Sequence, residues 1–474
     1  MLLALFLGLW GIEREHSMWR DEAATWQAAH RSMGEILHMI GQVDLVHGLY
    51  YAVMHVNFAL FGDSLVTLRL PSVLAAAGAC GLTALLAARL AGRWVGRAAG
   101  LALALMPAVQ EHAQEGRPYA FVLFFVVLST SLLVSAVQRP GRRRWTAYAA
   151  AVLVAALLNW MALFTLAAHA VTLVWIRADR RRLTGWARAA GAVLAGALPL
   201  VLLSREQAAQ VAWIDPVAWP TVLAAGGTVG VAALCALLPL TRAAAGPRGD
   251  GRDVPLGLGA LALPLCAVPQ LGLLGISLFK PLYVTRYVLF SYAGLALLLG
   301  ALTVTFAARL RAHPGTVTGL TACAALLALL PYEVALRTAD SRVDDVLSAA
   351  DHVARAGAGA DGVLYIPAAR RDTSLVSPGA FDGMTDLAMA QGPVDSGTLK
   401  GIEAAPHAIT RAMKGARRIV VISDPGPRSL CSARDRAKWH TLEGDFVRRS
   451  DTVERGRRVS VYERRDGQAR PVPR

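Results

Sequence analysis

Long apolar runs alternate with short arginine-rich breaks over the first 336 residues of the chain. Runs such as 65–86, 119–137 and 287–307 match the length of about 20 residues that a helix needs to cross the hydrocarbon core of a bilayer. The whole pattern predicts eleven transmembrane helices, and so an all-α polytopic membrane bundle. The expected spans are 1–12, 65–88, 98–113, 119–137, 145–161, 163–177, 187–203, 220–240, 254–279, 286–307 and 316–333.

The breaks between the runs predict how the bundle is oriented. Every second break is rich in arginine, and the positive-inside rule places that set in the cytoplasm. An odd number of spans then places the tail of the chain outside, as expected for a multi-pass protein of the plasma membrane. The arginine-rich breaks are 89–97, 138–144, 177–188, 242–252 and 309–311, and the outward segments are 13–64, 113–118, 204–219 and 280–286.

The tail differs from the rest of the chain, because it is polar and carries short strand-like runs between helical stretches. This alternation predicts a small α/β domain. We therefore expect a transmembrane module over 1–336 and an extracytoplasmic α/β domain over 337–474. The tail contains neither of the glycine-rich motifs that bind nucleotide phosphates. The strand-like runs are 362–366, 418–422 and 458–462.

Composition agrees with a membrane protein, since 55% of the residues are hydrophobic and only 17% are charged, against about 25% charged in soluble domains. A net charge of +15 would suggest nucleic acid as the partner of a soluble chain. Here much of that charge is the arginine of the breaks, so we expect the lipid bilayer as partner and no nucleic acid. The five cysteines have neither metal-ligand spacing nor the pattern of a disulfide framework.

The first outward loop, 13–64, is long for a connection, and long loops tend to carry function. Its pattern predicts two amphipathic helices, Glu22–Ile40 and Leu49–Phe61, of the kind that lie in a membrane interface.

The first of these helices starts at an acidic pair, Asp21-Glu22. Neighbouring residues on a helix point about 100° apart, so the two acids cannot play equal parts toward one ligand. One could act as a general base while the other positions it or pairs with Arg20 or another cation. In the alternative interpretation, Asp21 caps the helix and Glu22 stabilises its first turn.

Four motifs in order resemble the GT-C superfamily of lipid-sugar-dependent glycosyltransferases. Within it they resemble the branch that contains protein O-mannosyltransferases and the lipid A aminoarabinose transferase. The family has an Asp-Glu pair, then an acidic residue before His-Pro-Pro-Leu-Tyr-Tyr, then Phe-Gly with Leu-Arg-Leu-Pro-Ser, then Gln-Glu-x-Arg-x-Tyr-Ala. This chain departs from the pattern by losing the proline pair, since Val46-His47-Gly48 replaces the usual His-Pro-Pro. The matching residues are 21–22, 44–51, 61–72 and 114–120.

The resemblance implies a GT-C-like fold, a polyprenyl-phosphate-linked sugar donor and transfer to an acceptor hydroxyl on the outer face, with inversion. Mannose is the sugar expected by analogy, and the acceptor could be a protein, a glycolipid or a cell-wall glycan. Asp21 is the expected general base, with Glu22 as the second candidate. The leaving lipid phosphate needs cations, for which Arg117, Lys280 and Arg286 lie at outward helix ends.

Six further residues are expected to line the sugar or acceptor pocket. Alternatively, the polar residues could form hydrogen bonds that hold the loop in shape, and the tyrosines could belong to the belt of aromatic side chains at the membrane interface. Glu22 could also join Asp44 and His47 around Mg or Mn, although the expected reaction requires no cofactor. The six are Asp44, His47, Tyr50, Tyr51, Glu115 and Tyr119.

Two other classes of protein compete with this interpretation. A transporter or lipid flippase with an outer binding domain would place charges near the midplane of its spans, whereas here acids and bases concentrate at the outer ends. A non-catalytic membrane protein with an outer ligand-binding domain leaves the four ordered motifs unexplained.

Overall fold

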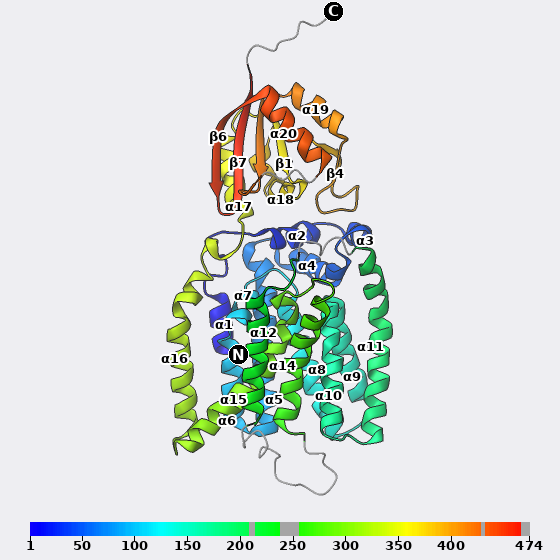
Figure 1. Ribbon diagram of the computed structural model, residues 1–474, viewed down its shortest axis with the longest axis vertical. Helices are drawn as coiled ribbons and strands as arrows, with labels where there is room; N and C mark the ends of the chain where they lie inside the picture. The colour runs from blue at the N-terminus through cyan, green and yellow to red at the C-terminus, as the bar shows by residue number, and fades with distance from the viewer. Residues whose placement is uncertain (208–213, 238–255, 428–431, 466–474) are drawn as a thin grey trace, which may run out of the picture. The chain divides into compact units, whose positions relative to one another are not determined.

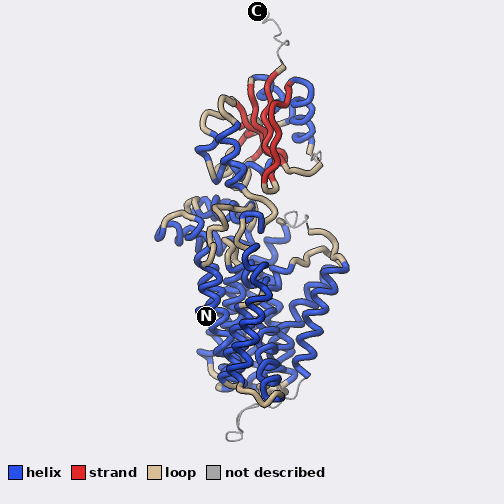
Figure 2. The backbone as a smooth tube through the Cα atoms, turned by 90° about the vertical axis from the view of Figure 1, so that its left-hand side faces the viewer, coloured by secondary structure: helices blue, strands red, loops and turns tan. Residues whose placement is uncertain are grey.

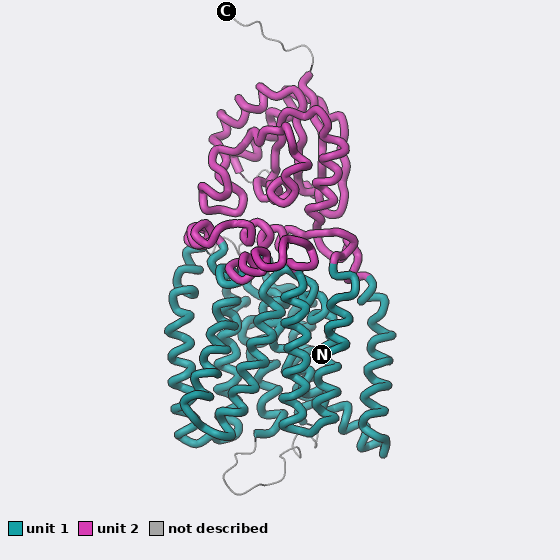
Figure 3. The backbone as a smooth tube through the Cα atoms, turned by 180° about the vertical axis from the view of Figure 1, so that it is seen from behind, with its two compact units in different colours: residues 1–12, 44–50, 69–334 teal, residues 13–43, 51–68, 335–474 magenta. Residues whose placement is uncertain are grey.

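The computed structural model describes residues 1–207, 214–237, 256–427 and 432–465. Its contacts divide the chain into two compact units, which Figure 3 distinguishes by colour. Most of the first outward loop groups with the tail and not with the spans. Unit 1 comprises residues 1–12, 44–50 and 69–334, and unit 2 comprises 13–43, 51–68 and 335–474.

Unit 1 is a bundle of helices that lie side by side (Figure 1). Seven helices of the described chain are long and apolar enough to cross a membrane, namely those over 65–91, 119–138, 180–206, 219–237, 258–277, 285–309 and 314–335. The helices are α1 Leu2–Leu9, α5 Leu65–Ala91, α6 Arg93–Ala104, α7 Pro107–Ala113, α8 Tyr119–Gln138, α9 Arg142–Leu158, α10 Phe164–Trp175, α11 Arg180–Glu206, α12 Trp219–Leu237, α14 Leu258–Ser277, α15 Tyr292–Arg309 and α16 Pro314–Ala335.

Each expected span contains helix among the described residues, so the predicted polytopic bundle is confirmed, but only seven of the eleven expected spans are long and apolar enough to cross a membrane. The third span is broken into α6 and α7 around Leu105-Met106, because Pro107 opens a new helix there. The adjoining ends of the spans expected over 220–240 and 254–279 lie outside the described residues, as does the arginine-rich break 242–252.

Small residues let the helices of unit 1 approach closely. A Cβ atom placed on Gly300 of α15 would lie 2.6 Å from the backbone nitrogen of Ala99 in α6. On Gly294 it would lie 2.4 Å from the carbonyl oxygen of Ala262 in α14. Backbone contact of this kind is how membrane helices associate, because lipid provides no hydrophobic drive between them.

Unit 2 contains a five-stranded sheet in the order β2-β1-β5-β7-β6. The strands are β1 Gly362–Ile366, β2 Thr385–Asp386, β5 Arg418–Ser423, β6 Phe446–Glu454 and β7 Arg457–Arg464, and the short β3 Met389–Gln391 and β4 Ile402–Glu403 pair separately. β1 runs parallel to β2 and β5, whereas β7 runs antiparallel to β5 and β6. Figure 2 shows the strands gathered between helices.

Apolar side chains cover both faces of this sheet. Helix α17 (Val346–Ala356) packs against one face, and α19 (Pro406–Gly415) and α20 (Ala433–Asp445) pack against the other. The three strand-like runs of the sequence are the central strands β1, β5 and β7, so the predicted α/β domain is confirmed. Strand β6 was not predicted, because most of its side chains are exposed and polar.

The first outward loop has three helices where the pattern predicts two. They are α2 (Arg20–Ala29), α3 (Met33–Gln42) and α4 (Gly48–Phe61). The single helix expected over 22–40 is interrupted because Ser32 starts a new helix. Its hydroxyl accepts from the Glu35 amide, and the Glu35 carboxylate accepts from the Ser32 amide at 2.8 Å, which is a capping box.

Replacing Gly300 with valine is expected to lower the thermal midpoint of the detergent-solubilised protein, because the new side chain would push α15 away from the backbone of α6. Overpacking of this kind costs about 1–3 kcal/mol or more. Gly319→Val on α16 is the matched control, since nothing lies within 4 Å of a Cβ placed there. Equal midpoints for the two variants would contradict the close approach.

Candidate functional site

The acidic pair lies in the first turn of α2, in unit 2. The helix begins at Arg20 with Trp19 as its N-cap, so Asp21 does not cap it. Glu22 is fully buried, and its carboxylate accepts a hydrogen bond from the guanidinium of Arg14, which is also buried. Asp21 is only partly buried. The two acids therefore differ in burial, since Glu22 is enclosed together with Arg14 and Asp21 reaches the surface in part.

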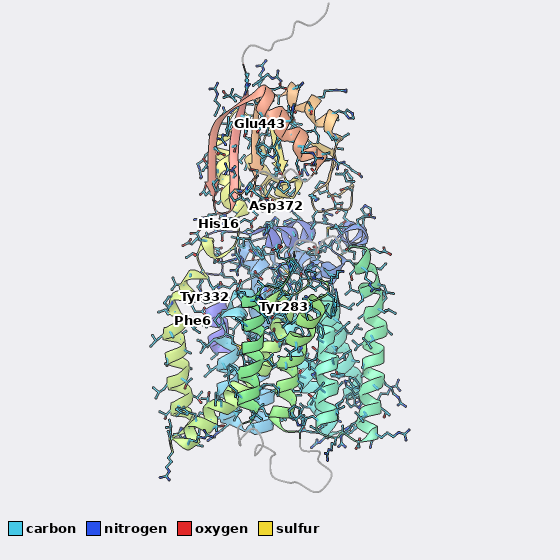
Figure 4. The ribbon with its side chains drawn as sticks, in the orientation of Figure 1. Phe6, His16, Tyr283, Tyr332, Asp372 and Glu443 are labelled. Carbon is cyan, nitrogen blue, oxygen red and sulfur yellow. The ribbon has the colours of Figure 1, made fainter. Side chains whose placement is uncertain are left out.

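A left-handed turn brings Arg14 to Glu22. Arg14, Glu15 and His16 have φ angles of 47°, 53° and 58°. Residues other than glycine rarely adopt this backbone conformation, because it costs energy. Figure 4 labels His16 in this turn. Such a turn persists only where its surroundings hold it, and strained backbone of this kind is concentrated at functional sites.

The start of the tail domain holds the segment that leads into α2. The amide of Met18 donates to Oδ1 of Asp345 at 3.2 Å, and the carbonyl oxygen of Met18 accepts from the amide of Val346 at 2.7 Å. The amide of Arg20, the first residue of α2, donates to Oδ1 of Asp344 at 3.1 Å. A carboxylate from the tail thus takes the place of a side-chain cap on the helix that carries the acidic pair.

A buried ionic network supports Asp344. Its Oδ2 lies 3.0 Å from Nη2 of Arg457, and Arg457 also donates to both carboxylate oxygens of Asp372, at 2.5 and 2.8 Å. Asp372 lies on the short helix α18 (Asp372–Val376), which packs against α2 (Figure 4). Burial alone would lower the pKa of Arg457, but the carboxylates of Asp372 and Asp344 outweigh it and raise that pKa. Arg457 therefore stays charged.

In unit 1, Asp44, His47 and Arg117 form a chain of hydrogen bonds. Nδ1 of His47 lies 2.7 Å from Oδ1 of Asp44, and Nε2 of His47 lies 3.0 Å from Nη2 of Arg117. Because arginine can only donate, Nε2 of His47 must accept this hydrogen bond. Nδ1 of His47 must then carry the hydrogen and donate it in the hydrogen bond to Asp44. A neutral imidazole thereby links the loop acid to the guanidinium of Arg117.

Gly48 follows this chain at the start of α4. Its φ of −55° and ψ of −45° are ordinary helical angles, and proline is well suited to the first position of a helix. The backbone here is therefore compatible with the proline that the family has. The one hydrogen bond that proline would remove runs from the Gly48 amide to the Leu45 carbonyl oxygen.

A second group of candidate site residues in unit 1 lies among aromatic rings. Glu115 is buried and accepts from Nδ1 of His112 at 2.7 Å, and the His112 ring lies 5.5 Å from that of Tyr119. The guanidinium of Arg286 lies 5.7 Å from the centre of the Tyr119 ring, within the range of a cation–π contact. Lys280 is exposed, and its ammonium group forms no ion pair with any described residue.

The predicted site residues thus fall on both units. Tyr50 is buried with its ring 5.7 Å from that of Phe121, and Tyr51 is also buried. Sequence patterns missed Arg14, His112, Asp344 and Asp345, because no local spacing marks a partner that only folding supplies. Unit 2 carries Asp21, Glu22 and Tyr51, and unit 1 carries Asp44, His47, Tyr50, Glu115, Arg117, Tyr119, Lys280 and Arg286.

The described residues contain no group of three or more His, Cys, Asp or Glu side chains that could hold a metal ion. The structure therefore lends no support to a divalent site built from Glu22, Asp44 and His47.

Known proteins resemble this chain in part of its sequence and in its fold. Residues 49–205 match the family model of dolichyl-phosphate-mannose-protein mannosyltransferases. The crystal structure of ArnT from Cupriavidus metallidurans in the apo state has a TM-score of 0.60 at 16% identity, with 97% of this chain and 96% of that chain covered. ArnT bound to undecaprenyl phosphate has a TM-score of 0.61, also at 16% identity, with 99% and 98% covered. A search of the curated proteins returned no match.

The chain therefore has the ArnT fold, and the match over residues 49–205 agrees with the membrane glycosyltransferase that the motifs predict. More narrowly, the fold over almost the whole chain is that of ArnT, including the tail domain.

Arg14→Met is expected to destabilise unit 2, because it leaves the buried carboxylate of Glu22 without its ion-pair partner. Breaking a buried pair costs about 3–5 kcal/mol. The double variant Arg14→Met/Glu22→Gln should recover much of this loss, since no buried charge then remains. Thermal midpoints of the wild type, both single variants and the double variant measure the coupling. Additive effects would contradict the pairing.

Asp345→Ala is expected to loosen the segment before α2, because the amide of Met18 and the first turn of α17 both lose their acceptor. A loss of about 1–2 kcal/mol corresponds to a 5–30-fold faster opening of those hydrogen bonds. Hydrogen exchange of peptides covering residues 16–22 measures it. Asp351→Ala, an exposed acid on the same helix, is the control. Equal exchange in both variants would exclude this anchoring role.

Proposed function

We propose that this protein transfers a sugar from a polyprenyl-phosphate donor to an acceptor hydroxyl on the outer face of the plasma membrane, with inversion. Asp21 acts as the general base. The observation that carries the proposal is the different state of the two acids: Glu22 is neutralised by Arg14 within the fold, while Asp21 is the partly exposed carboxylate of the same helix turn. General-base assistance contributes about 10²–10⁴-fold to such a reaction.

Glu22 then has a positioning role. Its buried ion pair with Arg14 joins the left-handed turn to the first turn of α2. The hydrogen bonds that Asp344 and Asp345 accept from Arg20 and Met18 hold the backbone between those two points. Together they fix the direction in which Asp21 leaves the helix, and precise orientation of a base is worth a large part of its catalytic effect.

Cations on unit 1 stabilise the leaving lipid phosphate. Arginine binds phosphate bidentately and keeps its charge, so no proton donor is needed on the leaving side. The guanidinium of Arg117 donates to His47 at 3.0 Å and is proposed to bind the phosphate through its planar fork. Arg286 lies against the rings of Tyr119 and Tyr287 and is proposed as the second cation. Lys280 is proposed as a third, exposed cation. The ArnT structure with undecaprenyl phosphate supports a lipid-phosphate ligand for this fold.

The substrate classes follow from the same comparisons. The matched family model concerns dolichyl-phosphate-mannose and protein acceptors, which supports mannose as the first donor to test. The proposed acceptors are a protein, a glycolipid or a cell-wall glycan, and the pocket for them involves Asp44, Tyr50, Tyr51, Glu115 and Tyr119. No metal ion is required by this mechanism, because arginine supplies the positive charge.

Asp21→Asn is expected to lower kcat by about 10²–10⁴-fold, because the amide cannot take up the proton of the acceptor hydroxyl. The assay follows label from polyprenyl-phosphate sugars into the acceptor fraction of membranes that contain the variant. Binding of polyprenyl phosphate should be unchanged, since the leaving phosphate contacts other residues.

Two variants sharpen this experiment. Asp63→Asn removes an exposed carboxylate of the same loop, which accepts from His30 at 2.9 Å, and should keep full transfer. Arg286→Gln should weaken binding of polyprenyl phosphate itself. Full activity of Asp21→Asn would refute the assignment of the base. Full activity together with an inactive, correctly folded Glu22→Gln would transfer that role to Glu22.

A further inference from the structure

A hollow of about 520 Å³ lies between α9 and α11 in unit 1. Arg142 of α9 and Arg181 and Arg188 of α11 contribute to its wall, and Trp145 closes one side. The hollow belongs to the arginine-rich ends of these helices, so it lies apart in the sequence from every residue of the proposed catalytic site. No aspartate or glutamate is among its lining residues.

The lining residues lie on one face of α9 and on one face of α11. Arg181, Gly185 and Arg188 follow one another at intervals of four and three residues on α11, which places them on one face of that helix. Arg142 and Thr146 are spaced four apart on α9. Both helices therefore turn a basic face toward the same space.

A buried tryptophan shapes this space. Trp145 is 9% exposed, and its ring packs edge-on against Tyr148 at 5.9 Å. Gly185 makes room for it, because a Cβ atom there would lie 2.4 Å from Nε1 of Trp145. The wall is thus part of the packed core of the bundle and is not formed by flexible side chains alone.

The three arginines bring positive charge that no described part of the chain neutralises. All three are exposed, and none forms an ion pair with a described residue. The nearest acid in sequence, Asp179, pairs instead with Arg182, which does not line the hollow. Guanidinium groups that converge without acids are suited to a phosphate group.

The surroundings of the hollow indicate which phosphate it takes. α11 exposes Leu194, Leu198 and Leu202, and little of its span is buried, so this helix borders lipid. A phosphate ester whose acyl chains lie in the bilayer can enter from that side. Basic pockets between transmembrane helices bind anionic lipid headgroups in this way.

We propose that Arg142, Arg181 and Arg188 form a binding site for the phosphate group of an anionic phospholipid, at the arginine-rich end of the bundle. The site is independent of the sugar-transfer chemistry. It anchors α9 to α11 through a lipid, because one phosphate bridges guanidinium groups from both helices. The bound lipid therefore stabilises the bundle.

The test uses the full-length protein in a neutral detergent and follows its thermal midpoint during titration with short-chain phosphatidylglycerol. Phosphatidylcholine and inorganic phosphate serve as separate titrations. The pocket variant is Arg142→Gln/Arg188→Gln. Its matched control is Arg143→Gln/Arg180→Gln, which removes the same charge from exposed neighbours on the same two helices that do not line the hollow.

Phosphatidylglycerol should raise the midpoint of the wild type and of the control, and phosphatidylcholine should not. Each basic group near a lipid surface is worth about 1 kcal/mol, so the pocket variant should bind at least about tenfold more weakly than the control. Equal responses of pocket variant and control would overturn the site. Inorganic phosphate acting as strongly as the lipid would overturn the lipid as its occupant.

A second pair of substitutions keeps the test decisive if the glutamine variant is unstable. Arg142→Lys/Arg188→Lys retains the charge but loses the planar fork that binds phosphate bidentately. It should bind phosphatidylglycerol more weakly than the wild type and more strongly than the glutamine variant. Binding as strong as that of the wild type would mean that positive charge alone attracts the lipid, and would contradict the proposal.

Discussion

The backbone hydrogen bonds accepted by two neighbouring aspartates, Asp344 and Asp345, are the constraint on which the arrangement of unit 2 depends. They connect the first turn of the tail domain to the backbone of Met18 and Arg20, more than 300 residues earlier in the chain. These bonds are short-range and directional, so the start of α2 is placed by the tail and not by its own sequence. The tail domain therefore acts as a support for the loop that carries the acidic pair.

This support uses buried charge, which is costly unless every charge is matched. Arg457 is matched by Asp344 and Asp372, and a second network joins Arg371 to Asp386 and Glu403, with Lys438 on Glu403 at 2.8 Å. Ion pairs constrain geometry more narrowly than apolar packing does, because each donor must meet its acceptor within a few tenths of an ångström. The networks thus favour one position of α18, and with it one position of α2, which packs on it.

Pairing between charged and polar side chains also distinguishes the two candidate acids and orients Arg117. Glu22 is matched by Arg14 inside the fold, whereas Asp21 in the same helix turn is only partly buried. In unit 1, Asp44 fixes the tautomer of His47, and His47 in turn accepts from Arg117. A loop acid is thus linked to a guanidinium through the ring of His47.

Hydrophobic spacing alone predicted the spans, because a helix that crosses a bilayer must be apolar over a fixed length whatever its neighbours are. Alternation likewise predicted β1, β5 and β7, whose buried side chains leave a clear pattern. Ordered motifs indicated Asp21, His47 and Arg117 as candidates. Only the tertiary structure decided that Glu22 pairs with Arg14, and that Asp344 and Asp345 hold the start of α2. Arg14 reaches Glu22 through a left-handed turn, and Asp344 reaches the start of α2 from more than 300 residues away. Neither contact can be predicted from local sequence, because both depend on how the chain folds.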